Sequence, residues 1–421
     1  MNHNIYAHIQ SKLIDQSEKD ILITHTGISF TGSELEAYTE AMARVILNYG
    51  VTVGDRVSVQ VEKSWVNVVL YLSVIRIGAV FLPLNSAYTD SEIDYFLNDA
   101  IPKLHVCSED RISHASSLKS KIETLSIAIL NGESGPLFDE MQAELKNDKS
   151  KTQTVDRRSD DLAAIIYTSG TTGQPKGAMI SHGNLKANAA MLTETWGYSV
   201  NDILLHALPL FHVHGLFVAL NLAFINGGAI ILLPKFSPEM VIRFLPNATI
   251  LMGVPTFYTR LLADKSFTSE KGKNLRLYIS GSAPLLVETS NAFFDRTGHR
   301  ILERYGMTET GMSCSNPLYG DRRAGTVGFP LPGVEVRCVD DNGNEVPRGE
   351  IGSLEVRGNH VFAGYWNLPD KTASEFRGNW FITGDLAIQS EDGYISIVGR
   401  SKDLIISGGL NIYPKEIEDI L

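Results

Sequence analysis

The stretch LAAIIYTSGTTGQPKG, residues 162–177, places a short apolar run directly before a segment of small and polar residues. The second part contains glycines, hydroxyl residues, one proline and one lysine, Lys176. Because glycines carry no side-chain bulk, the backbone N–H groups of such a loop can close on an anion, while hydroxyls and one ammonium supply further donors. A buried strand followed by an anion-binding loop is typical of α/β proteins, so this stretch predicts both a fold class and a phosphate ligand.

The loop differs from a Walker phosphate loop. That pattern requires G-x-x-x-x-G-K-[ST], whereas here Lys176 is followed by Gly177 and preceded by Gln174 and Pro175. A loop selected only for flexibility is the alternative interpretation. The lysine beside a Ser/Thr/Gly block favours phosphate binding.

Strand and helix patterns alternate around this loop up to about residue 310. Thr31 and Glu34 form a T-x-x-E capping box before a helical pattern that stops at Gly50. Ser237 followed by Pro238 marks the start of another helix. The short apolar runs between the helices are typical of buried parallel strands. We therefore expect an α/β fold of mostly parallel sheets covered by helices.

The pattern changes from about residue 325. Residues 325–398 read as short strands with turn signals, among them Asn342–Gly343, and predict a smaller β-rich subdomain. We expect residues 1–400 to form one large N-terminal domain that includes this subdomain.

Composition excludes several classes of partner. The 421 residues include 37 basic and 48 acidic side chains, a net charge of −11, which argues against non-specific binding to nucleic acid or to anionic membranes. The longest apolar stretch, residues 217–234, is broken by asparagines and a Gly-Gly pair and predicts a helix, a turn and a strand rather than a membrane span. Cys107, Cys314 and Cys338 lie far apart, which favours a reducing, cytoplasmic location.

Three further motifs narrow the function. They are ERYGMTET at 303–310, GDL at 384–386 and GRSKDLIISGGLNIYPKEIE at 399–418. Together with the loop they resemble the signature motifs of the adenylate-forming superfamily, which contains acyl-CoA synthetases, luciferases and the adenylation domains of peptide synthetases. The resemblance covers nearly the whole chain. It implies attack of a carboxylate on the α-phosphate of Mg·ATP, followed by transfer of the acyl group to a thiol, usually that of coenzyme A.

The resemblance also implies roles for individual residues. The expected contacts to the ATP phosphates are Thr168, Ser169, Gly170, Thr171, Thr172, Gly173 and Lys176. The expected adenine contacts are Gly281, Ser282, Ala283, Glu303, Arg304 and Tyr305. Asp385 and Arg400 are expected at the ribose. Lys176, Thr308 and Glu309 are expected to be catalytic, with Glu309 as the magnesium ligand because a hard cation prefers carboxylate oxygen.

The end of the chain carries expectations of its own. By resemblance Lys402 is the domain hinge, and Gly408 and Gly409 match the segment that meets coenzyme A. The family's catalytic lysine lies near the end of a small C-terminal domain and has no counterpart here. We therefore expect residues 401–421 to be the hinge and the first part of a truncated C-terminal domain, and adenylation to be impaired.

The acid is expected to be malonate, and the sequence leaves methylmalonate open as an alternative. Residues 208–217, 251–262 and 301–337 resemble malonyl-CoA synthetases closely. A second carboxylate requires a cation that a fatty-acid pocket would lack, and Arg276 is the candidate, on one strand face with Ser280. An arginine at the start of a strand more often makes an ion pair, so that reading stays open.

Other residues near the expected acid site have weaker assignments. By resemblance His212 lines the acyl pocket together with Met252, whereas His214 is expected to be structural. Arg322 and Arg323 could also meet an anion, although paired arginines in a loop are usually solvated. The competing functions are a fatty-acyl or aromatic-acid CoA ligase, an adenylation module that loads a carrier protein, and a silent nucleotide-binding protein.

Overall fold

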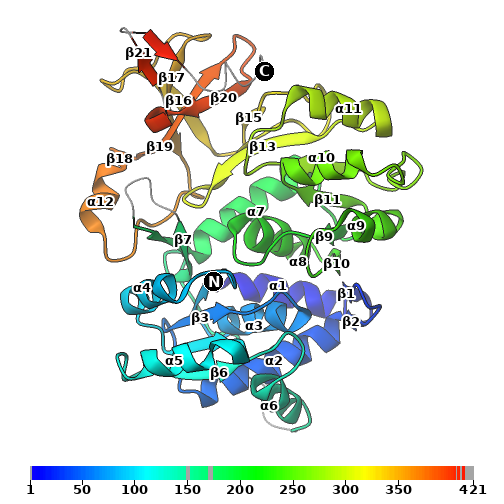
Figure 1. The fold of residues 1–421 in the computed structure, drawn as a ribbon, viewed down its shortest axis with the longest axis vertical. Coiled ribbons are helices and arrows are strands. Elements are labelled where there is room, and N and C mark those ends of the chain that lie inside the picture. The colour runs from blue at the N-terminus through cyan, green and yellow to red at the C-terminus, as the bar shows by residue number, and fades with distance from the viewer. Residues whose placement is uncertain (1, 148–151, 169–173, 404, 408–409, 413–421) are drawn as a thin grey trace.

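The computed structural model describes residues 2–147, 152–168, 174–403, 405–407 and 410–412. Two large sheets with their helices make up most of the molecule, and a third, smaller sheet lies at one end (Figure 1). This confirms the predicted α/β class with mostly parallel strands. No helix in the described part of the chain is both long and apolar enough to cross a bilayer.

The first large sheet has six strands and carries the start of the phosphate loop. In spatial order they are β6 (Ser126–Ile129), β5 (Leu104–Cys107), β3 (Arg56–Gln60), β4 (Val80–Pro83), β7 (Leu162–Thr168) and β8 (Lys176–Ser181). All neighbours are parallel except β7 and β8, which are antiparallel with Thr168 opposite Lys176. Strands β7 and β8 therefore form a hairpin, and a strand rather than a helix follows the phosphate loop.

Helices cover both faces of the six-stranded sheet. On one face lie α4 (Asp90–Ala100) and α5 (Ile112–Lys119), whose apolar residues pack on Val80, Leu82 and Ile165. The other face, with Phe81, belongs to the main core together with α2 (Gly32–Asn48) and α3 (Trp65–Arg76). Helix α6 (Pro136–Leu145) packs on α2, and the short turn η1 (Glu109–Arg111) leads into α5.

The second large sheet has nine strands. In spatial order they are β15 (Phe329–Pro330), β14 (Gly311–Ser315), β13 (Leu302–Met307), β12 (Leu277–Ser280), β11 (Ile250–Gly253), β9 (Ile203–His206), β10 (Ala229–Leu232), β1 (Asp20–Thr24) and β2 (Ser29–Thr31). The strands from β13 to β1 are parallel, and both ends of the sheet are antiparallel. The helices around it are α1 (Ile5–Asp15), α7 (His182–Trp196), α8 (Asn221–Ile225), α9 (Pro238–Phe244), α10 (Pro255–Ala263) and α11 (Val287–Thr297), with the turn η3 (Leu245–Asn247) after α9.

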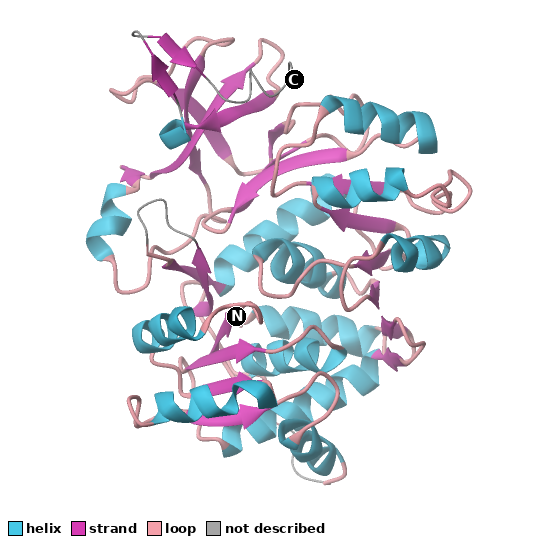
Figure 2. Ribbon diagram, in the orientation of Figure 1, coloured by secondary structure: helices cyan, strands magenta, loops and turns pink. Residues whose placement is uncertain are grey.

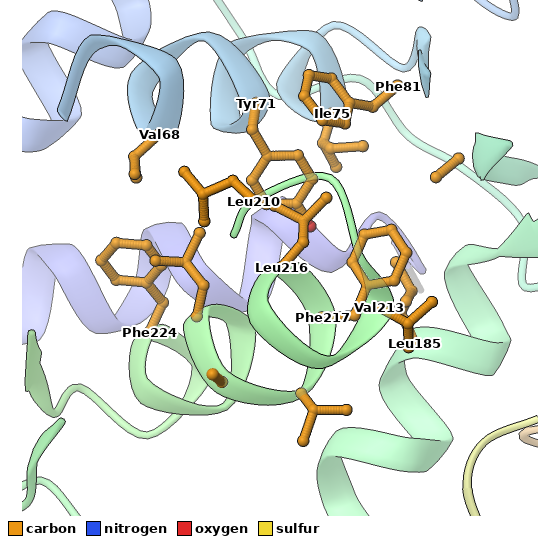
Figure 3. Close-up of a cluster of buried hydrophobic side chains, with 14 of the residues drawn as sticks. Val68, Tyr71, Ile75, Phe81, Leu185, Leu210, Val213, Leu216, Phe217 and Phe224 are labelled. Carbon is orange, nitrogen blue, oxygen red and sulfur yellow. The ribbon is translucent and has the colours of Figure 1, made fainter. Parts of the chain in front are cut away.

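The main hydrophobic core lies where these two layers meet. It joins α3 to the π-helical segment η2 (His214–Leu220), and Figure 3 shows Leu216 and Phe217 of η2 facing Tyr71 of α3. The Tyr71 hydroxyl donates a hydrogen bond to Asn221 Oδ1 at 2.9 Å. Residues 217–234 thus form helix, turn and strand, as predicted.

The third sheet confirms the predicted β-rich subdomain (Figure 2). Its strands are β16 (Glu335–Val339), β17 (Ile351–Arg357), β19 (Trp380–Gln389), β18 (Phe376–Arg377) and β20 (Ile395–Arg400), all antiparallel. Helix α12 (Pro369–Ser374) precedes β18, and the turn η4 (Ser401–Asp403) leads to the pair β21 (Ile405–Ser407) and β22 (Leu410–Ile412). Gly343 has φ +85° in the turn between β16 and β17, a conformation that glycine adopts without strain.

The predicted helix starts are also confirmed. Thr31 and Glu34 form a reciprocal capping box at α2, and Gly50 after that helix has φ +78°. Ser237 Oγ accepts the Met240 N–H at α9, with Pro238 at the first helical position.

Candidate functional site

Two adjoining cavities lie between the carboxyl ends of the parallel strands and the β-rich subdomain. Their volumes are about 600 Å³ and about 350 Å³. Ligands of open α/β sheets bind at such strand ends. The residues that line both cavities are Ser282, Arg304, Gly306, Met307 and Arg400.

Lys176 lies in the larger cavity at the first position of β8. Its side chain is buried, with the ammonium 4.4 Å from the centre of the Tyr365 ring and 3.7 Å from Glu375 Oε1. Glu375 is also contacted by Lys371. Thr168 lines the same cavity opposite Lys176, whereas Ser169, Gly170, Thr171, Thr172 and Gly173 lie outside the described residues. The face of the Tyr365 ring and one long ion pair with Glu375 thus hold the ammonium in place. A phosphate could take over as the partner of this ammonium.

Glu309 lies close to this lysine. It is 5% exposed, and Tyr365 Oη donates a hydrogen bond to its Oε1 at 2.8 Å. Burial raises the pKa of Glu309, although the hydrogen bond and the nearby Lys176 act in the opposite direction. Its neighbour Thr308 also lines the cavity.

Glu309 suits a magnesium ion that is bound mainly by other groups. The described part of the chain contains no cluster of three potential protein ligands. Magnesium in nucleotide sites typically takes one or two carboxylates and fills its remaining positions with phosphate oxygens and water. A single buried carboxylate close to the buried Lys176 fits that pattern.

Tyr305, Asp385 and Arg400 come together at the smaller cavity. The Tyr305 hydroxyl donates to Asp385 Oδ2 at 2.5 Å, and Arg400 Nε lies 3.2 Å from Asp385 Oδ1. Burial raises the pKa of Asp385, while these two partners favour its ionised form. The strand pair β19–β20 sets this arrangement, because Asp385 lies directly opposite Arg400 in the ladder.

The segment after β12 lines the smaller cavity with Gly281, Ser282 and Ala283. Ser282 adopts φ +69°, the left-handed region. A Cβ at Gly281 would lie 2.4 Å from Arg304 Cζ, so this glycine leaves room for the guanidinium. Glu303 lines the same cavity and accepts the Gly325 N–H at 3.1 Å. The structure therefore brings all six expected adenine residues to one cavity.

Arg304 has an unusual environment. It is 3% exposed, and its Nη2 donates to Ser282 Oγ at a long 3.5 Å. Among the described residues its Nε has no hydrogen-bond partner. Burial lowers the pKa of Arg304 to about 9. A buried cation with a spare donor, at the junction of two cavities, is suited to an anion.

The residues expected at the acid separate into two groups. His212 lines the larger cavity, and Ser280 lines the smaller one with its buried Oγ unpaired within the described structure. His214 also lines the larger cavity, beside Ser282 at 3.3 Å, and burial holds its pKa well below the ordinary value. Met252, in contrast, is a buried core residue of β11 and lines neither cavity.

The position of Arg276 differs from the one expected for a residue that binds the second carboxylate of the acid. Its guanidinium forms a bidentate ion pair with Asp202, at 2.7 and 2.8 Å, and donates to the carbonyls of Trp196 and Gly197. It precedes β12 at the amino end of that strand, whereas Ser280 and the cavities lie at the carboxyl end. Arg276 is therefore a structural residue, the alternative that its position at a strand start had left open.

The remaining candidates lie outside the cavities. Arg322 donates to the carbonyls of Arg300, Pro317 and Leu318, and Arg323 pairs with Asp392 at 2.8 Å. Lys402 is exposed in η4. Gly408 and Gly409 lie outside the described residues.

Sequence reasoning did not identify Tyr365 and Glu375 as site residues. Both reach Lys176 from the segment before β19, which lies much further along the chain. Pairing of residues 363–366 with β8 brings them there, and no local pattern marks that pairing.

The comparisons with known proteins agree with this geometry. The sequence model described as AMP-binding enzyme matches residues 12–366. A probable CoA ligase, CCL8, from Humulus lupulus is 34% identical over 95% of this chain and 70% of its own length. The mitochondrial malonate–CoA ligase ACSF3 of Xenopus laevis is 37% identical over 86% of this chain and 68% of its own. The crystal structure of ATP-bound MatB from Rhodopseudomonas palustris has a TM-score of 0.95 and 48% identity, with 99% of this chain and 82% of that chain covered. The chain therefore belongs to the AMP-binding enzyme family and is an AMP-forming acyl-CoA synthetase.

Proposed function

We propose that this enzyme joins malonate to coenzyme A. In the first step one malonate carboxylate attacks the α-phosphorus of ATP, which forms malonyl-adenylate and releases pyrophosphate. In the second step the thiol sulfur of coenzyme A attacks the acyl carbon, the bond to AMP breaks and the thiol proton is lost. The buried Arg304 at the junction of the two cavities is the observation that carries the choice of malonate.

The nucleotide occupies both cavities in this proposal. Lys176 and Thr168, with residues 169–173, hold the phosphates. The adenine lies against residues 281–283 and Tyr305, and Asp385 and Arg400 bind the ribose hydroxyls. Glu309 would hold a magnesium ion, which would neutralise charge on the phosphate oxygens. Lys176 and Thr308 act where negative charge builds up during attack, in a site whose donors are already fixed.

Arg304 supplies the cation for the second malonate carboxylate, the role first considered for Arg276. A carboxylate buried without a partner is strongly disfavoured, so a dicarboxylate pocket requires a cation that a fatty-acid pocket does not. Arg304 remains protonated at neutral pH, since its lowered pKa of about 9 lies above 7. A bidentate contact from its fork to a carboxylate would satisfy the unpaired Nε.

Arg304→Met tests the choice of acid. We expect kcat/KM for malonate, measured as pyrophosphate release with Mg·ATP and coenzyme A, to fall ~100-fold, and kcat/KM for acetate to change ~3-fold or less. Arg276→Met is the matched control, because its partner Asp202 is structural, and it should affect both acids equally. If Arg304→Met lowered kcat/KM for malonate and for acetate equally, the proposal of a dicarboxylate pocket would be wrong. A wild-type preference for octanoate or benzoate would favour a fatty-acyl or aromatic-acid ligase.

Two further features belong to this proposal. We place the enzyme in the cytoplasm, which fits three buried, unpaired cysteines, although the Xenopus laevis relative is named as mitochondrial. We also propose that residues 1–400 form the large domain and that Lys402 is the hinge. Recovery of the enzyme in the cytoplasmic fraction after cell fractionation tests the location. Limited proteolysis, with cleavage expected near Lys402, tests the division into domains.

A further inference from the structure

Helix α4 contacts both ends of the phosphate loop, although it lies about 70 residues earlier in the chain. Tyr95 Oη donates a hydrogen bond to the carbonyl of Pro175, the residue before Lys176, at 2.9 Å. Tyr167 Oη, from the residue before Thr168, donates to Asp99 Oδ2 at 2.6 Å. One turn of one helix thus fixes the entry and the exit of the hairpin.

The same turn also holds the segment that carries Tyr365. Trp366 Nε1 donates to the Asp99 carbonyl at 3.1 Å, and Asn367 Nδ2 donates to the same carbonyl at 3.2 Å. Trp366 N–H in addition donates to the Gly177 carbonyl at 2.8 Å. The ring beneath the Lys176 ammonium is therefore tied to α4 as well.

Helix α4 is well suited to be a fixed reference for these contacts. It starts with a reciprocal capping box, in which Thr89 and Glu92 satisfy each other's backbone groups. Its inner face, with Phe96 and Leu97, is buried on the six-stranded sheet. The Phe96 ring lies 4.4 Å from the ring of Tyr167.

We infer that Tyr95 and Asp99 of α4 are positioning residues for ATP binding, because together they hold Lys176 where the phosphates arrive. The inference rests on the proposed function, which gives Lys176 its role. A lysine side chain has many rotamers, and fixing the backbone on which it is mounted lowers the entropic cost of binding. Neither Tyr95 nor Asp99 lines the two cavities, so their effect has to pass through the hairpin or through the segment that carries Tyr365.

Tyr95→Phe removes one hydroxyl and leaves the ring in place. We expect the Kd for Mg·ATP, measured by calorimetry on the whole chain, to rise ~5-fold, with the thermal midpoint nearly unchanged. Asp99→Ala, which removes the carboxylate that accepts the Tyr167 hydroxyl, should have a similar effect and serves as the second variant. Tyr49→Phe is the matched control, since it removes a hydroxyl bound to Glu140 at 3.0 Å away from the cavities, and it should leave the Kd as it is.

A double-mutant cycle with Lys176→Met shows whether Tyr95 acts by positioning Lys176 or by strengthening ATP binding independently of it. If Tyr95 acts through Lys176, Tyr95→Phe adds no further loss of ATP affinity once the ammonium is gone. An equal loss with and without Lys176 would overturn the inference, and so would an unchanged Kd in both Tyr95→Phe and Asp99→Ala while Lys176→Met weakens ATP binding. Absence of ATP binding by the wild-type chain would instead overturn the proposed function, and the inference with it.

Discussion

Glu309 illustrates the conflict between stability and function at a single residue. It is buried, and desolvation raises its pKa, so the folded protein disfavours the ionised form that the proposed magnesium ion would need. For a carboxyl whose folded pKa is raised, the stability it contributes is complete below the unfolded pKa and is lost as the pH rises through the folded pKa. Ionised Glu309 therefore destabilises the ligand-free protein near neutral pH.

Glu309→Gln is expected to stabilise the ligand-free enzyme on the order of 1 kcal/mol at pH 8 and to abolish most activity. Gln keeps an oxygen that can accept the Tyr365 hydroxyl, so the hydrogen bond survives. Thermal unfolding at pH 8 and pH 4.5 tests this, because the gain should shrink at the lower pH, where the wild-type carboxyl takes up its proton. A variant less stable than the wild type at pH 8 would show that the hydrogen bond outweighs desolvation.

The two arginines show where residue-level reading of a sequence fails. Arg276 and Arg304 are both single cations near strands of the same sheet, and a sequence does not reveal their partners. Asp202, which neutralises Arg276, lies 74 positions away and reaches it only through the packing of neighbouring strands. The motif around Arg304 predicted an adenine contact, and the structure places this residue at both cavities, but its burial and spare donor are properties of the assembled cavity.

At the scale of elements, the connection after β9 carries His212 to the larger cavity, and Lys63 holds its start. The buried Lys63 ammonium donates to His206 Nδ1 and to the carbonyls of His206 and Leu208, all within 2.9 Å. Burial, followed by the nearby Lys63, lowers the pKa of His206 to about 3, so this ring is neutral and its Nε2–H can donate to the Gly215 carbonyl. Lys63 and His206 thus brace the connection at both ends.

Lys63→Met should therefore loosen this connection. We expect KM for the acid to rise ~10-fold, with a smaller change in KM for ATP, and a stability loss of about 2 kcal/mol from the acceptors left unpaired. Lys235→Met is the matched control, because this exposed lysine lines the same 270 Å³ cavity as Lys63 on the other side of the connection. Steady-state kinetics with each substrate varied in turn test the difference, and equal effects on both KM values would argue for a general role in stability.

The sequence predicted most elements because their signals are local. Capping residues such as Thr31 and Ser237, and alternating apolar runs, act within one helix or one strand. The antiparallel return of β8 against β7 was not predicted, since a small-residue loop fits a hairpin and a strand–helix turn equally well. The π-helical segment η2 was also missed, because its sequence resembles any buried helix.

The whole molecule places its site where three sheets meet. Lys176 comes from the six-stranded sheet, Arg304 and Glu309 from the nine-stranded sheet and its edge, and Asp385 from the β-rich subdomain (Figure 1). The core that joins the two large sheets therefore also fixes the distances within the site. Damage to that core should impair activity more than equal damage elsewhere.

A pair of leucine substitutions tests this coupling. Leu216 and Leu245 are both fully buried, but Leu216 lies in the core between the large sheets (Figure 3) and next to Gly215, which lines the larger cavity, whereas Leu245 belongs to a separate cluster under α9 and α10. Each change to alanine should cost about 3 kcal/mol, the usual penalty for such a cavity. Only Leu216→Ala should also lower kcat/KM for the acid, by ~10-fold or more, when both variants are assayed at a temperature where they remain folded. Equal kinetics in two equally destabilised variants would show that the site is insulated from the core that joins the sheets.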